Sequence, residues 1–214
     1  MLSLDAATTS AERFAFLPLG DLISADRGPW MECLKAFLAA TQLLEHDPAG
    51  AISILNALGQ APFLRYLTWT CSADPEPLLR FHNDQAFLIE TREALSCQQE
   101  ELFSAVANDL GTGPIGALQV QRFWRDHSAL VLQTFQRLCT LYARASAARN
   151  DDEGREEWCH RGLMACVIFG LPISDELETL AEGDEWHLNE QAVALRFARR
   201  WRTLVGQGMA VSQA

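Results

Sequence analysis

Residues 114–149 of the chain read PIGALQVQRFWRDHSALVLQTFQRLCTLYARASAAR. Large, mostly apolar side chains recur there every three or four residues, at Val120, Trp124, His127, Val131, Phe135, Leu138, Tyr142 and Ala145. The opposite face carries Arg122, Asp126, Gln133, Arg137, Thr140 and Arg144. This spacing is close to a heptad and predicts one long helix, the most buried element of the fold, that is suited to the centre of an antiparallel bundle.

Helix start and stop signals on both sides of this stretch predict further helices. Asp47-Pro48 and Ser174 are start signals, because a side-chain oxygen can accept a hydrogen bond from a free backbone N–H and proline suits the first turn. The helix before Asp47 has apolar positions at Leu34, Phe37, Leu38, Thr41 and Leu44, which lie on one helical face. The predicted helices cover residues 9–17, 30–45, 48–58, 62–69, 78 or 84 to 109, 153–170, 175–182 and 185–206.

No segment alternates β-branched and aromatic residues with polar ones, as a half-buried strand would. The sequence therefore predicts an all-α fold: a compact bundle of about seven to nine helices, mostly antiparallel, with no significant sheet. Residues 1–29 are predicted to be an N-terminal segment with one short helix that packs through Phe14, Phe16 and Leu17, and residues 30–214 a single helical domain. The proline-rich run 71–77 is the best candidate for a hinge within that domain.

The six cysteines are predicted to be reduced and buried. They are Cys33, Cys71, Cys97, Cys139, Cys159 and Cys166, and none forms a CxxC pair of the kind that holds zinc. The chain starts without the basic and apolar regions of a signal peptide, and no run of about 18–20 apolar residues could span a bilayer. We therefore expect a cytoplasmic protein that does not associate with membranes.

A formal net charge of −11 argues against nucleic acid as a partner, because the phosphate backbone repels such a surface. Much of the excess negative charge is local, since residues 151–190 carry twelve acids and two arginines. From this stretch we predict an acidic binding surface made of Asp151, Asp152, Glu153, Glu156, Glu157, Asp175, Glu176, Glu178 and Glu182. Its expected partner is another protein with a basic surface.

The residues also leave an alternative open, in which the chain is a metal- or haem-dependent enzyme or cofactor carrier. Glu157 and His160 stand three residues apart, the spacing of carboxylate-bridged metal sites in helical bundles. His127 lies in the apolar stripe of the long helix, where a buried histidine can be a haem ligand or a general base. A complete site of that kind needs a second Glu-and-His pair on another helix, so we expect no metal or cofactor.

The pair Asp126-His127 resembles the Asp-His of the TorD-like maturation chaperones, which are also acidic, all-helical and of similar length. The Glu-Pro that precedes the pair in that family is missing, because Phe123-Trp124-Arg125 stands there. The likeness covers a dozen residues at most, and the chain is not assigned to the family.

No catalytic motif is present, neither a Gly-x-Ser-x-Gly elbow nor a glycine-rich phosphate loop. We therefore favour a non-enzymatic helical protein-binding factor, which could be an adaptor, chaperone, immunity or regulatory protein. Six tryptophans fit such a role, because aromatic residues concentrate at protein interfaces, although each one by itself is better explained as core.

Overall fold

A computed structural model describes residues 3–16, 28–72, 100–108, 113–169 and 171–182 of the chain. In these residues the protein is all-helical, with eight helical segments and no strand, which confirms the predicted all-α fold and the absence of a sheet there. Seven helices have both ends described: α1 (Leu4–Ala15), α3 (Gly28–Leu43), α4 (Pro48–Gly59), α5 (Pro62–Thr70), α8 (Gly113–Ala148), α9 (Asp152–Phe169) and α10 (Asp175–Ala181). The eighth segment covers residues 100–108. The predicted helix at 185–206 and residues 73–77 of the candidate hinge lie outside the described residues.

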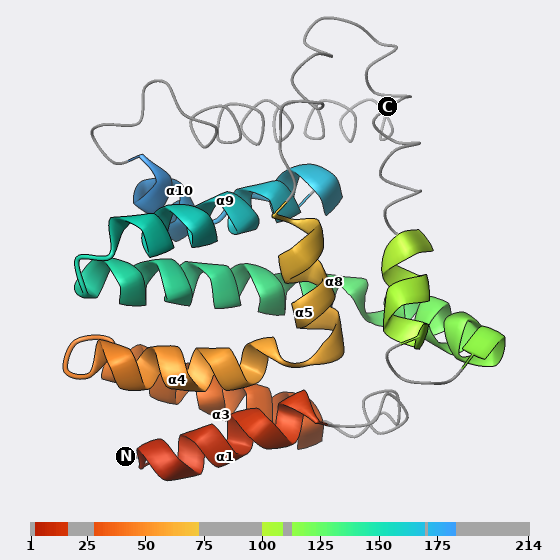
Figure 1. The fold of residues 1–214 in the computed structure, drawn as a ribbon, viewed down its shortest axis with the longest axis horizontal. Helices are drawn as coiled ribbons and strands as arrows, with labels where there is room; N and C mark the ends of the chain where they lie inside the picture. Colours follow the sequence, from red (N-terminus) through yellow and green to blue (C-terminus); the bar gives the residue numbers. More distant parts are fainter. Residues whose placement is uncertain (1–2, 17–27, 73–99, 109–112, 170, 183–214) are drawn as a thin grey trace, which may run out of the picture.

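The long helix α8 lies in the middle of the described helices (Figure 1). On one side of it α1, α3 and α4 pack against one another, and α4 and α5 contact α8. On the other side α9 runs along α8, and α10 packs against both. Gly162 of α9 permits this close approach, because a Cβ there would lie 2.9 Å from a methyl group of Leu177 and 3.3 Å from the Cβ of Cys139.

The stripe that the spacing predicts on α8 is buried, and burial extends beyond it to Phe123, Leu132, Cys139 and Leu141. Seven of the eight residues in its stripe are buried, and His127 is half-buried. On the opposite face Arg122, Asp126, Gln133 and Arg137 are exposed. Arg144 is half-buried, and Thr140 is buried and donates its hydroxyl to the backbone oxygen of Gln136 over 2.9 Å.

Two helix starts have the predicted caps. The backbone N–H of Gly50 donates to Asp47 Oδ1 over 2.9 Å, and the N–H of Leu177 donates to Ser174 Oγ over 3.3 Å. Asp151 caps α9 in the same way, accepting from Gly154 over 2.9 Å. Asn150, with φ of 55°, occupies the left-handed region in the short turn between α8 and α9, which asparagine tolerates better than most residues.

The N-terminal helix is longer than the predicted 9–17. It begins at Leu4, because the side chain of Ser3 accepts a hydrogen bond from the N–H of Ala6 and supplies the cap. Thr8 lies inside the helix rather than at its start, and its hydroxyl donates to the backbone oxygen of Leu4. Phe14 is in the core as expected, whereas Phe16 is 77% exposed, so the prediction that it packs is wrong.

The apolar face predicted for α3 is also wrong at two positions. Phe37 and Leu44 are buried, but Leu34 is 40% and Leu38 is 48% exposed. Apart from Phe37, the buried residues of α3 are small, namely Cys33, Ala36, Ala39 and Ala40. Because α3 is apolar on nearly all sides, periodicity alone could not select the buried one.

Five cysteines lie in the described part of the chain, and all five are buried and free, as predicted: Cys33, Cys71, Cys139, Cys159 and Cys166. Burial raises the pKa of the Cys33, Cys159 and Cys166 thiols to about 12. No described helix combines the length and the apolar character that crossing a membrane requires.

Candidate functional site

The nine acids predicted as a binding surface lie on α9, α10 and the residues that flank them (Figure 1). Seven of the nine are exposed, and Glu156 and Glu178 are half-buried. Since α10 packs against α9, the two groups of acids belong to neighbouring helices. The stretch 151–182 holds only two arginines to balance them, Arg155 and Arg161. We refer to these nine residues as the acidic surface.

Arginines form ion pairs with members of the acidic surface on both helices. Asp152 contacts Arg155 at 3.2 Å and Glu157 contacts Arg161 at 2.5 Å, both within α9. Glu176 contacts Arg144 of α8 at 2.8 Å, so one basic residue of the central helix neutralises part of the charge. The three carboxylates are more than half exposed, and such pairs contribute little to stability.

Asp151 has a structural role in addition to its surface charge. Its carboxylate accepts the hydrogen bond from Gly154 that begins α9. A substitution at Asp151 would therefore weaken the helix as well as change the surface charge. Glu153 and Asp175 are exposed, and neither is involved in a described ion pair. Substitutions at these two positions therefore change the surface charge without breaking a described ion pair.

The residues of the alternative metal site come from two helices. Glu157 is exposed and its carboxylate binds Arg161, while His160 is half-buried on the same helix. His127 belongs to a different helix, α8. Its ring lies against the ring of Phe123, with the two ring centres 5.0 Å apart. Among the described residues, no three His, Cys, Asp or Glu side chains are grouped in a way that could hold a metal ion.

Asp126 does not orient His127. Its carboxylate accepts a hydrogen bond from Arg125 Nε over 2.9 Å, and this bond holds the pKa of Asp126 below its usual range. Both members of that ion pair are exposed. The Asp-His pair noted in the sequence is therefore an adjacency along the helix rather than a hydrogen-bonded dyad.

A stack of aromatic and charged groups attaches α9 to α8. The rings of Tyr142 and Trp158 lie parallel, 3.9 Å apart at an angle of 2°, and the guanidinium of Arg161 lies 4.5 Å from the Trp158 ring. The Tyr142 hydroxyl donates to Asn56 of α4, and Arg161 Nε donates to the hydroxyl of Ser72 over 2.9 Å. The stack holds the helix that carries much of the acidic surface in a defined position.

The tryptophans divide between core and surface. Trp124 is buried, Trp30 and Trp158 are half-buried against the core, and Trp69 is 69% exposed. Trp186 and Trp201 lie outside the described residues. Most of the described tryptophans therefore fill the interior, and among them Trp69 is the one that is available to a partner.

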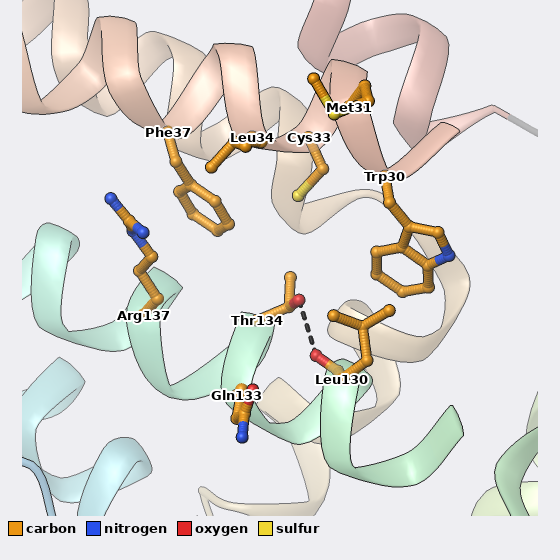
Figure 2. Close-up of a pocket in the computed structure, with 9 residues that line it drawn as sticks. All are labelled: Trp30, Met31, Cys33, Leu34, Phe37, Leu130, Gln133, Thr134 and Arg137. Carbon is orange, nitrogen blue, oxygen red and sulfur yellow. Dashed lines mark hydrogen bonds between the residues drawn. The ribbon is translucent and has the colours of Figure 1, made fainter. Parts of the chain in front are cut away.

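Sequence reasoning missed a second surface, a groove between α3 and α8 with a volume of about 340 Å³. Figure 2 shows side chains of α3 facing those of α8 across it, with Trp30 and Leu130 at one end and Phe37 and Arg137 at the other. One feature of the sequence could have indicated this groove. The helix α3 has more large apolar residues than a single buried face requires.

Comparisons of the chain with protein-family models, with curated proteins and with solved structures found no match.

Proposed function

We propose that the chain is a non-enzymatic protein-binding factor whose acidic surface on α9 and α10 attracts a partner with a basic surface. The observation that carries the proposal is the exposure of seven carboxylates on two neighbouring helices, in a stretch that holds two arginines against nine acids. The role is that of an adaptor, chaperone, immunity or regulatory protein.

The surface would act mainly on the rate of encounter. Clustered charge of one sign steers an oppositely charged partner and raises the association rate, while salt weakens this effect as the Debye length falls from about 10 Å at 0.1 M. The rigid attachment of α9 through Tyr142 and Trp158 would keep the charges preorganised.

The test uses charge reversal at positions that do not cap a helix. The surface variant is Asp152→Lys, Glu153→Lys and Asp175→Lys, which spares the cap at Asp151. The matched control is Glu12→Lys, Glu45→Lys and Glu101→Lys, with the same change in net charge at exposed positions away from α9 and α10. Thermal unfolding of both variants checks that the fold is intact.

A pull-down from the native host with the unmodified protein identifies the partner, and association rates are then measured at about 0.05 M and 0.3 M salt. We expect the surface variant to associate about tenfold more slowly than the control at low salt, with the difference shrinking at high salt. Equal association rates for the two variants would overturn the proposal that the acidic surface attracts the partner. Stoichiometric metal or haem that is lost on substitution of His127 or His160 would overturn the non-enzymatic proposal.

A further inference from the structure

The groove between α3 and α8 has an apolar floor and apolar rims. Cys33, Phe37 and Thr134 form the floor, each less than a tenth exposed. The Thr134 hydroxyl donates to the backbone oxygen of Leu130 over 2.7 Å (Figure 2), so the proton of this hydroxyl already has an acceptor within the protein. The Cys33 thiol is neutral, because burial raises its pKa to about 12.

The rims expose large apolar side chains on both helices. Met31 and Leu34 of α3 are 46% and 40% exposed, and Leu130 of α8 is 40% exposed. Leu38, which does not line the groove but is 48% exposed, follows Leu34 by four residues, so the three residues at i, i+3 and i+7 lie along one side of α3. This is the pattern of a helix face that another element covers, and no described element covers it.

The groove has the shape that suits a helix. α3 and α8 run in the same direction along it, from Trp30 and Leu130 to Phe37 and Arg137 (Figure 2). Seven residues of helix correspond to about 10 Å, or two helical turns. Two adjacent helical ridges form a channel in which the side chains of a third helix interdigitate. An amphipathic helix places apolar residues at the same i, i+3 and i+7 spacing into such a channel.

The charge at one end specifies the occupant further. Arg137 is the single charged residue among those lining the groove, and its guanidinium lies 5.4 Å from the Phe37 ring. It forms no ion pair with a described residue, although the chain as a whole has a net charge of −11. An occupant with a carboxylate opposite Arg137 would therefore complement the groove.

We propose that the groove between α3 and α8 binds an amphipathic helix of a partner protein, with apolar residues between Leu34 and Leu130 and an acidic residue beside Arg137. This inference goes beyond the acidic surface and does not depend on it, because no residue of that surface lines the groove.

The test uses two stapled helical peptides of about 15 residues, with leucines spaced i, i+3 and i+7. One carries glutamate near the end that meets Arg137, and the other carries lysine there. We expect the full chain to bind the glutamate peptide saturably and about fivefold more tightly than the lysine peptide, and Arg137→Glu to reverse that preference. Leu34→Lys should abolish binding of both peptides.

The control is Leu118→Lys, on the same helix as Arg137 but beside a different cavity, which Trp124 and Arg122 also line. We expect it to bind both peptides as the unmodified chain does, and so should the surface variant of α9 and α10. The proposal is overturned if the chain binds neither peptide, if Arg137→Glu leaves the preference unchanged, or if Leu118→Lys rather than Leu34→Lys abolishes binding. A concentration-dependent dimer that Leu34→Lys dissociates, seen by sedimentation, would assign the groove to a second copy and overturn it too.

Discussion

Single residues make contacts whose contributions can be separated by substitution, and Tyr142 is the clearest case. Its hydroxyl donates to Asn56 of α4, while its ring stacks on Trp158 of α9. Tyr142→Phe should cost only about 1 kcal/mol, because Asn56 is exposed and water can replace the donor. Tyr142→Ala also removes the stack and leaves a cavity, and should cost about 3–5 kcal/mol. Urea unfolding measures both, and equal losses would contradict this division.

The buried thiols predict a loss of stability at alkaline pH. In the unfolded chain a thiol ionises near its ordinary pKa of 9.0, whereas Cys33, Cys159 and Cys166 stay protonated in the fold up to about pH 12. The stability is therefore unaffected below pH 9 and decreases as the pH rises above it. At pH 10 each thiol should cost about 1 kcal/mol. Urea unfolding between about pH 8 and pH 10 tests this, and the double variant Cys159→Ala and Cys166→Ala should show a weaker pH dependence.

At the scale of elements, α8 supports the packing on both sides. Phe135 is fully buried in its stripe, and truncation to Ala should cost about 3–5 kcal/mol, through lost burial and the cavity left behind. Arg122→Ala, on the exposed face of the same helix, is the control and should change stability by less than about 0.5 kcal/mol. Denaturant unfolding measures both, and a loss below about 1 kcal/mol for Phe135→Ala would show that this face carries little of the core.

For the whole molecule, the uneven charge predicts that salt stabilises the fold. The net charge is −11, and nine acids stand against two arginines in residues 151–182, so mutual repulsion opposes the compact state. Raising sodium chloride from about 0.02 M to 0.3 M should increase the Tm by a few degrees. The charge-reversed surface variant should respond less. A Tm that falls with salt would mean that the ion pairs outweigh the repulsion.

Much of the fold could be predicted from the sequence, because the features concerned are local. The spacing from Val120 to Tyr142 indicates both the helix and one row of its buried residues, since large apolar side chains recur there every three or four residues. The caps at Asp47, Asp151 and Ser174 each depend on a hydrogen bond that spans three residues. The exposure of the acidic surface follows as well, because charged side chains are rarely buried.

The groove was decided by the packing of helices that are distant in the chain. α3 is apolar on nearly all sides, so its sequence does not say whether Ala36 and Ala40 or Leu34 and Leu38 meet the core. The packing of α1 and α4 against α3 settles that choice and leaves Leu34 exposed in the groove that Arg137 of α8 also lines. Burial depends on which surfaces meet in three dimensions, and no local pattern of residues contains that information.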